Sequence, residues 1–269
     1  MLRLILLSTL LILQVIPPQL VAKDYTDGTG VLPVPAGLSQ AEVARLFEKG
    51  KKACAINCQS RFGTLLGIAD GAAGKSNCSS ACIDPEYSFL NLTTGEITVH
   101  TKDPKDSNLH YIGVIYQCIE YARKWWMINK GISFNSVDSA YEIFYLPTIF
   151  NIRTKATTPL ARSVNGSAKR PPRKGDLVIY YPDRTIPRWF YGHVAVVVDT
   201  NLEQGNIAIA EQNFLNKAWD NPKAYSRKLQ LIKNNDHYTL EDPSEYKKNN
   251  SGGIIAGWVY PYEDEVKDK

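Results

Sequence analysis

One cysteine in this chain stands where nucleophilic chemistry requires it. Cys118 begins the stretch Cys-Ile-Glu-Tyr-Ala-Arg and follows Gln117. Further along the chain, His193 follows Gly192, and Glu211 lies eighteen residues beyond His193. Amide cleavage by a thiol requires a thiolate, a base that accepts and returns its proton, and an acid that orients the base. The three side chains in this order therefore predict a cysteine hydrolase.

A predicted helix explains how the thiol of Cys118 would be activated. Apolar residues at helical spacing predict a helix over residues 116–130, and Gly131 suits the left-handed position after it. Cys118 then lies in the first turn, where unpaired backbone N–H groups favour a thiolate and can hold an oxyanion. The side-chain amide of Gln117 would supply a second donor to that oxyanion.

Two predicted strands bring the other two catalytic candidates together. Residues 194–198 and 207–210 are short apolar runs with turn-forming residues between them, which is typical of a hairpin. Its strands would place His193 and Glu211 on one face, so that Glu211 fixes the imidazole tautomer. Asn213 is two residues further along and points the same way, so it would share this supporting role.

Each of these residues also has an ordinary structural interpretation. A lone cysteine is more often a small buried hydrophobic residue than a nucleophile, and a histidine can be satisfied within a core. We favour the catalytic interpretation because the three residues occur in order, each within its own local motif. The other histidines lack such a context, and we expect them on the surface: His100, His110 and His237.

The remaining four cysteines, Cys54, Cys58, Cys78 and Cys82, form two pairs with the same internal spacing. In an oxidising compartment such pairs predict two disulfides. Cys54 and Cys58 would lie on one face of a helix, a poor geometry for a mutual bond, so we favour the nested pairing Cys54–Cys82 and Cys58–Cys78. A zinc site is the alternative, although four-cysteine sites more often have two residues between ligands. We therefore expect no metal and no cofactor.

The N-terminus has the features of a secretory signal peptide over residues 1–22. Arg3 provides a positive charge, an apolar run over residues 4–16 follows it, and Val21-Ala22 offers a cleavage point. A retained anchor is the alternative, because Leu20 is not the small residue that cleavage prefers. No later segment approaches the roughly 18 apolar residues of a membrane span. We expect a secreted or extracytoplasmic protein with no membrane association after signal removal.

The rest of the chain divides into three parts. Residues 23–105 form an N-terminal extension that contains the paired cysteines and would serve as a lid, an inhibitory pro-segment or a partner surface. Residues 106–262 form the predicted catalytic domain. Residues 263–269 form a charged tail that we expect to be disordered.

Local patterns within these parts predict an α+β protein. Ser39 and Glu42 have the spacing of a capping box at a helix start, whereas residues 61–84 are rich in Gly, Ala and Ser and predict a loop or lid. A further helix is predicted over residues 136–145. Short strands then follow, the last over residues 254–260. Helices first and a mainly antiparallel sheet after them is an α+β order.

The charge of the chain limits its partners. The net charge is +4, which is too small to indicate nucleic acid as a partner. Four basic residues surround a pair of prolines, and for them a solvated loop is favoured over an anion-binding patch. These residues are Lys169, Arg170, Arg173 and Lys174.

The motifs around the candidate residues resemble those of the CHAP amidohydrolase/peptidase family, a branch of the papain-like superfamily. Residues 117–123 resemble its helix start, residues 192–195 its Gly-His-Val-Ala motif, and residues 211–213 its Glu-Gln-Asn motif, which Trp219 follows. The resemblance covers residues 106–262 and is closest to the amidase domain of glutathionylspermidine synthetase/amidase and trypanothione synthetase. Two shorter stretches are also similar, residues 139–144 and 174–177.

This resemblance implies a papain-like CHAP fold, with N-terminal helices packed on a mainly antiparallel β-sheet. It implies Cys118 as nucleophile, His193 as base and Glu211 as orienting acid. It also suggests that Arg123, one turn below Cys118, contacts a carboxylate of the substrate. Asp138 would lie near the same pocket, with capping of its own helix as the alternative.

The resemblance and the signal peptide lead to one expected function and two alternatives. We expect a secreted cysteine amidase that hydrolyses an amide bond of a small peptide–polyamine conjugate, similar to glutathionylspermidine, through a thioester. Because glutathionylspermidine is a cytosolic metabolite, the first alternative is a CHAP peptidase or amidase that cleaves cell-wall peptides of peptidoglycan. The second is a non-enzymatic secreted effector or surface domain that keeps only the fold.

Overall fold

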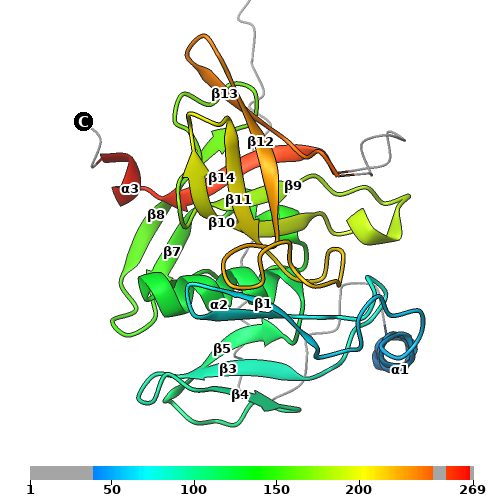
Figure 1. Cartoon of the computed structure of the whole chain (residues 1–269). Helices are drawn as coiled ribbons and strands as arrows, with labels where there is room; N and C mark the ends of the chain where they lie inside the picture. The colour runs from blue at the N-terminus through cyan, green and yellow to red at the C-terminus, as the bar shows by residue number, and fades with distance from the viewer. Residues whose placement is uncertain (1–38, 245–252, 267–269) are drawn as a thin grey trace, which may run out of the picture.

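The computed structural model describes residues 39–244 and 253–266 (Figure 1). The predicted signal peptide, residues 1–22, and the predicted extended segment, residues 23–38, lie outside the described residues. Within the described ranges, no helix combines the length and the apolar character that crossing a membrane would require.

A nine-stranded sheet in the order β13-β12-β11-β10-β9-β14-β8-β7-β6 forms the centre of the molecule. All of its strand pairs are antiparallel, which confirms the predicted α+β class with a mainly antiparallel sheet. Its strands are β6 (Ile132–Ser133), β7 (Thr148–Asn151), β8 (Thr157–Val164), β9 (Leu177–Tyr180), β10 (His193–Asn201), β11 (Asn206–Ala210), β12 (Arg227–Asn234), β13 (His237–Glu241) and β14 (Ile255–Pro261).

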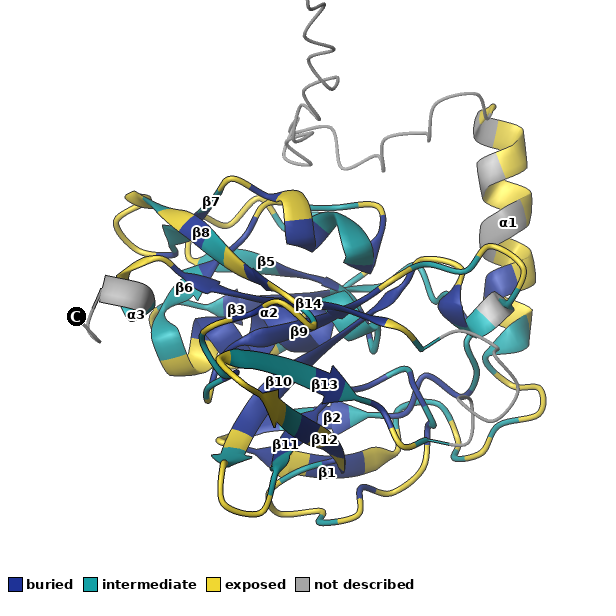
Figure 2. Ribbon diagram, turned by 90° about the horizontal axis from the view of Figure 1, so that it is seen from above, coloured by how far each residue is buried: buried dark blue, intermediate teal, exposed yellow. Residues whose placement is uncertain are grey.

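The central strands of this sheet are buried on both faces, which explains their uninterrupted apolar sequences (Figure 2). On one face, Trp125 and Trp126 of the helix α2 (Cys118–Lys130) pack in one cluster with Val194 and Val196 of β10. The alternate residues of β10 belong to a second apolar cluster on the opposite face. The helix that carries Cys118 and the strand that carries His193 are thus both anchored in the core.

The helix that carries Cys118 begins two residues later than the sequence predicts and ends where it predicts. Gln117 is the extended N-cap residue, and Gly131 takes the left-handed cap position with φ +65°. The helix predicted over residues 136–145 is instead a short 3₁₀ helix, η1 (Ala140–Tyr145). Its aromatic and β-branched residues have a low helix propensity, which accounts for the shorter element.

The N-terminal extension begins with the predicted capping box. The Ser39 side chain accepts from the backbone N–H of Glu42, and the Glu42 carboxylate accepts from the backbone of Ser39 at 2.7 Å. The helix α1 (Gln40–Ala53) follows and stands at one side of the molecule (Figure 1).

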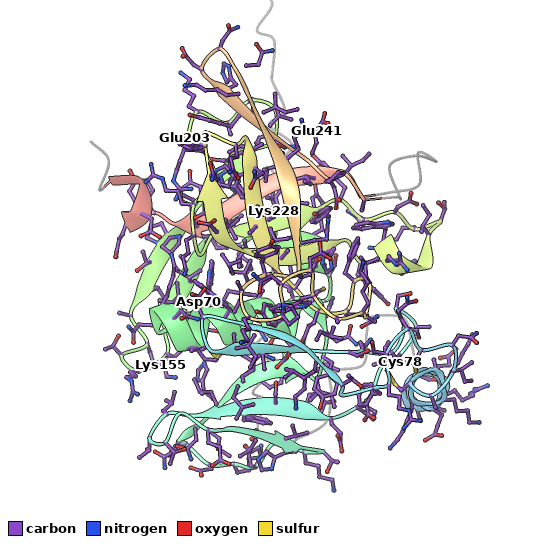
Figure 3. The ribbon with its side chains drawn as sticks, in the orientation of Figure 1. Asp70, Cys78, Lys155, Glu203, Lys228 and Glu241 are labelled. Atoms are coloured by element: carbon purple, nitrogen blue, oxygen red, sulfur yellow. A yellow bond between two sulfur atoms is a disulfide. The ribbon has the colours of Figure 1, made fainter. Side chains whose placement is uncertain are left out.

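Two nested disulfides join the end of α1 to a later loop. They are Cys54–Cys82 and Cys58–Cys78, the pairing that the sequence favours, and Figure 3 shows Cys78 beside α1. Since all four sulfurs are consumed in disulfides, they form no zinc site. Among the described residues, no group of three or more His, Cys, Asp and Glu side chains could hold a metal ion.

A hairpin replaces the loop or lid predicted over residues 61–84. The strands β1 (Leu65–Ala69) and β2 (Ala72–Lys75) pair in an antiparallel manner. Glycine is depleted in strands, so the composition of this segment predicts a loop. In the structure two of its glycines leave room for the ring of Trp219, since a Cβ at either Gly67 or Gly74 would lie 2.3 Å from that ring.

A small sheet in the order β4-β3-β5 covers the other side of α2 (Figure 1). Its strands are β3 (Tyr87–Asn91), β4 (Ile97–His100) and β5 (Leu109–Val114). The predicted boundary near residue 106 falls between β4 and β5, so residues on both of its sides form one sheet. The helix α2 therefore lies between two sheets, which fixes its position relative to β10.

The sequence predicts a disordered charged tail, but part of that tail is helical. Glu263–Val266 forms the short helix α3, and Asp264 pairs with Lys130 at 2.8 Å. Lys130 is in the last turn of α2, where a cation is favourable, and it draws the acidic segment back onto the domain. One further short 3₁₀ helix is η2 (Pro187–Trp189).

The contact between the hairpin and Trp219 makes a prediction about stability. Gly67→Ala would place a methyl group against a rigid indole ring, and such overpacking typically costs about 1–3 kcal/mol. Urea denaturation of the variant should therefore show a lower unfolding midpoint. In a Trp219→Leu background the same substitution should cost clearly less, because the collision is relieved. An equal cost in both backgrounds would show that Trp219 is not the residue that requires glycine.

Candidate active site

Cys118 is the first residue of α2 and, among the described residues, the cysteine that is free of disulfides. Its side chain is half-buried. As the first helical residue it has a backbone N–H with no acceptor inside the helix, and it stands at the positive end of the helix dipole. The thiol is therefore accessible from one side and next to groups that stabilise negative charge.

His193 is placed by the glycine before it. Gly192 has φ +70°, and a Cβ there would lie 2.5 Å from the carbonyl oxygen of Tyr180, so a side chain would collide with the backbone. His193 then begins β10, where its side chain is buried and close enough to Cys118 for the two groups to interact. The imidazole Nε2 bonds Glu211 Oε2 at 2.8 Å, which leaves Nδ1 for the thiol.

The register of the hairpin explains how Glu211 reaches His193. Val196 of β10 lies opposite Ala210 of β11, so Glu211 and His193 are diagonal neighbours on one face. Both side chains are almost completely buried. The structure thus brings the three predicted residues, Cys118, His193 and Glu211, together around the imidazole of His193.

Burial and charge decide the protonation of this chain. Burial alone lowers the pKa of His193, but its hydrogen bonds with Cys118 and Glu211, together with their charges, raise that pKa to about 9. Burial raises the pKa of Glu211, but the charge of Arg227 and the contact with His193 outweigh it and bring that pKa to about 2. At neutral pH the imidazole is therefore a cation beside an ionised carboxylate.

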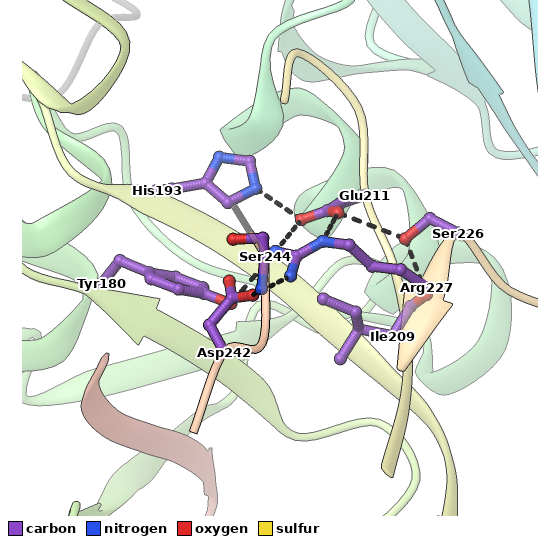
Figure 4. Close-up of polar contacts among 8 residues, drawn as sticks. All are labelled: Tyr180, His193, Ile209, Glu211, Ser226, Arg227, Asp242 and Ser244. Atoms are coloured by element: carbon purple, nitrogen blue, oxygen red, sulfur yellow. Dashed lines mark hydrogen bonds and ion pairs between the residues drawn. The ribbon is translucent and has the colours of Figure 1, made fainter. Parts of the chain in front are cut away.

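Arg227 neutralises the buried Glu211 (Figure 4). Its Nε donates to Glu211 Oε1 at 2.6 Å, and its Nη1 lies 2.7 Å from Asp242 Oδ1. The hydroxyl of Tyr180 donates to Asp242 at 3.0 Å, and Ser226 donates to Glu211 at 3.3 Å. A buried carboxylate without such partners would be costly, so this network keeps the acid of the catalytic chain ionised.

Sequence reasoning missed this network, although one signal was present. On β12, Arg227, Leu229 and Leu231 alternate with exposed residues, so the period of two places Arg227 on the buried face. A buried arginine requires an anionic partner, and a carboxylate next to a candidate histidine is an obvious one. Asp242 and Tyr180 carry no comparable local signal.

The Gln117 side chain does not have the role that the sequence predicts for it. Its two amide N–H bonds are directed to the carbonyl oxygen of Cys82 at 3.1 Å and to Asn77 Oδ1 at 3.4 Å. Neither is left for an oxyanion. The Oε1 atom of Gln117 accepts from Asn213 Nδ2 at 2.7 Å, so Asn213 does lie at the thiol side of the site.

The motifs around Cys118 and Glu211 are linked directly. Gln212 donates through Nε2 to the carbonyl oxygen of Gln117 at 3.0 Å and to the carboxylate of Glu120. Glu120 is itself buried and paired with Lys124 at 3.1 Å. The residue after the catalytic acid thereby holds the helix start that carries the thiol.

Arg123 does not reach the substrate side, contrary to the sequence prediction. Its guanidinium is buried beneath the helix and donates to the carbonyl oxygens of Ile112 and, at 3.3 Å, Asn135. It also lies 4.7 Å from the ring centroid of Phe134. These contacts give Arg123 a structural role, since a substrate carboxylate could not enter the space without opening the core.

Asp138 is exposed, and it precedes the N-cap residue of η1. The N-cap position is occupied by Ser139, and the backbone N–H of Asp138 donates to the Glu142 carboxylate at 3.0 Å. Asp138 is therefore not the cap residue itself, and a substrate contact for it stays a prediction.

Fold and site together define a class of protein, the papain-like cysteine amidohydrolases and peptidases. Residues 109–213 match the family model described as CHAP domain. The predicted resemblance and enzyme class are thereby confirmed.

Two kinds of curated relative support this assignment. The chain is 32% identical over 203 residues to the bifunctional glutathionylspermidine synthetase/amidase of Escherichia coli, which covers 76% of this chain and 30% of that protein. It is 30% identical over 154 residues to the trypanothione synthetase of Crithidia fasciculata, covering 57% of this chain and 22% of that protein. The chain thus spans less than a third of the length of these relatives.

One solved structure, that of Ly7917, is similar to a smaller degree. It has a TM-score of 0.28 and 15% sequence identity, and the match covers 55% of this chain and 53% of that one. This likeness is too low to inform fold or function.

The Arg227 network makes a prediction about stability at neutral pH. Arg227→Met would remove the guanidinium that lies between Glu211 and Asp242, and breaking a buried pair in this way typically costs about 3–5 kcal/mol. Urea denaturation at pH 7 measures this loss. The control is Lys228→Met, which removes a charge from the exposed face of the same strand (labelled in Figure 3). Equal losses for the two variants would contradict the role assigned to Arg227.

Proposed function

We propose that this protein hydrolyses amide bonds with Cys118 as nucleophile, His193 as general base and acid, and Glu211 as the orienting acid. The observation that carries the proposal is the buried His193, which interacts with Cys118 on one side and bonds Glu211 at 2.8 Å on the other. A histidine held in this way is a cation at neutral pH and can give its proton to a leaving amine.

The geometry supports a two-step reaction. The Cys118 sulfur attacks the amide carbonyl, and the C–N bond breaks as His193 gives its proton to the leaving amine, which leaves a thioester. Neutral His193 then takes a proton from water, the hydroxide attacks the thioester, and the C–S bond breaks to release the acid, which leaves His193 protonated as at the start. The protein supplies all proton transfers in this scheme.

Two donors are assigned to the oxyanion of both steps. One is the backbone N–H of Cys118 at the start of α2. The other is the side-chain amide of Asn213, which has one N–H on Gln117 Oε1 and a second for the oxyanion. This assignment replaces the Gln117 amide, whose N–H groups are already bonded to the N-terminal extension.

The substrate that we propose is a small peptide–polyamine conjugate of the glutathionylspermidine kind. The names of the relatives, a glutathionylspermidine synthetase/amidase and a trypanothione synthetase, support this class. We further propose that the protein is secreted by a signal peptide over residues 1–22, and that residues 106–262 form the amidase domain. The two disulfides support an oxidising compartment.

A second candidate substrate is a cell-wall peptide. The same disulfides favour it, because a protein outside the cytoplasm meets peptidoglycan more readily than a cytosolic metabolite. The CHAP domain itself is compatible with either substrate.

The catalytic assignment makes a prediction about Cys118→Ala. This variant should lose hydrolysis by at least about 10³-fold, because no other group can form the thioester. Its melting temperature should stay nearly unchanged, since the side chain is half-buried and small. Amine release followed by mass spectrometry and a thermal melt measure the two effects. Full activity in this variant would end the cysteine-amidase assignment.

The two substrates are separated in the same assay. Mature protein is incubated with glutathionylspermidine and, separately, with purified peptidoglycan. We expect release of spermidine from the first and no new amino termini from the second. Release from the wall material alone would reverse the choice of substrate, and release from neither would favour a non-enzymatic effector or surface domain.

A further inference from the structure

The two disulfides hold a loop that reaches the active site. This loop, residues 77–82, is called the disulfide loop below; it carries Cys78, bonded to Cys58, and Cys82, bonded to Cys54. It lies outside the 109–213 stretch that matches the CHAP family model. Its first residue, Asn77, is completely buried.

The buried Asn77 is held in one orientation by the loop. Its backbone N–H donates to Asn216 Oδ1 at 2.8 Å, and its side-chain Nδ2 donates to the carbonyl oxygens of Ser79 at 3.0 Å and Cys82 at 2.9 Å. A primary amide that donates to backbone carbonyls cannot be reversed without losing those bonds. The orientation of the Asn77 amide is therefore set by the loop backbone.

Asn77 closes a ring of three amides at the thiol side of the site. Gln117 Nε2 donates to Asn77 Oδ1 at 3.4 Å, and Asn77 Nδ2 shares its two N–H groups among the Ser79 and Cys82 carbonyls and Asn213 Oδ1 at 3.1 Å. Asn213 Nδ2 donates in turn to Gln117 Oε1 at 2.7 Å. Gln117 is adjacent to Cys118 in sequence, and Asn213 is two residues beyond Glu211, so the ring contacts both halves of the catalytic chain.

We propose that Asn77 is a positioning residue that orients the Asn213 and Gln117 amides for reaction at Cys118. The proposal rests on the proposed function, in which Asn213 donates to the oxyanion. Asn77 does not touch the reacting atoms itself. It fixes which face of the Asn213 amide carries oxygen and which carries N–H, and so keeps a donor directed at the carbonyl under attack.

The disulfides explain how a loop can hold such a residue. Cys78 has φ +63°, a conformation that costs free energy for any residue other than glycine and persists only where the surroundings impose it. The covalent links to Cys54 and Cys58 impose it here. The disulfide loop of the N-terminal extension thus contributes to the catalytic site in this proposal.

Two reactions of the same thiol separate positioning from general stability. Acylation of Cys118 by 4-nitrophenyl acetate passes through a tetrahedral oxyanion and releases 4-nitrophenol. Alkylation of Cys118 by iodoacetamide displaces iodide in one step and forms no oxyanion. A residue that acts through the oxyanion donors should affect the first rate and leave the second, including its pH profile, unchanged.

We expect Asn77→Ala to slow acylation by about tenfold or more, because removal of one oxyanion donor costs about 10²–10³-fold and misorientation costs part of that. Its alkylation rate should match the wild type. The control is Ser79→Ala in the same loop, whose hydroxyl contacts only the carbonyl oxygen of Ala53 at 3.4 Å, and it should leave both rates unchanged. In an Asn213→Ala background, Asn77→Ala should add almost nothing.

Equal acylation in Asn77→Ala and wild type would overturn the proposal while the proposed function stands. A parallel fall of both rates would also overturn it, since it would indicate a general loss of structure. Acylation of Cys118 gives an initial burst of 4-nitrophenol, which is measured as the difference between a protein and the Cys118→Ala variant. If wild type shows no burst above that variant, the nucleophile assignment fails, and the role of Asn77 fails with it.

Wild-type protein decides the matter if Asn77→Ala does not fold. Tris(2-carboxyethyl)phosphine reduces each disulfide to two thiols and becomes its phosphine oxide, with the oxygen and two protons supplied by water. Acylation of Cys118 in the reduced protein should slow, whereas its alkylation, followed by mass mapping of the Cys118 peptide, should persist. Unchanged acylation after complete reduction would contradict the proposal.

Discussion

The buried carboxylate of Glu211 is the constraint on which the rest of the site depends. An ionised carboxylate in a dry interior is stable only with cationic and hydrogen-bonding partners around it. Here His193 lies on one side at 2.8 Å and Arg227 on the other at 2.6 Å. Arg227 is in turn bonded to Asp242, so β10, β12 and the residues that directly follow β11 and β13 contribute charges to a single network. The sheet must keep its register for these charges to meet.

The thiol side of the site is held by neutral side chains. Neutral amides replace charges there, and the Gln117–Asn77–Asn213 ring joins the start of α2, the disulfide loop and the segment that follows β11. Gln212 adds a link between the same helix start and the strand that holds the acid. Charges thus set the protonation of the imidazole, and amides set the geometry around the sulfur, so each half can be perturbed separately.

The sequence predicted those parts of the site whose cause is local. Apolar runs gave the strands of His193 and Glu211, and the helix pattern with Gly131 gave the helix of Cys118. It failed where a distant partner decides the conformation. Gly67 and Gly74 suggested a loop because Trp219, the ring that requires them, is far away in the chain. Gln117 and Arg123 were misassigned for the same reason, since their partners come from the extension and from β5.

The protonation of His193 is the most direct test of the central claim, that thiol, imidazole and carboxylate form one chain. In ¹⁵N-histidine-labelled protein, with His193→Asn for assignment, the account predicts a His193 imidazolium at pH 7 that loses its proton near pH 9, because its pKa is raised to about 9. His110 gives an internal contrast, since burial and the charges of Lys155 and Arg123 lower its pKa to about 4. A His193 ring that is already neutral at pH 7 would contradict the account.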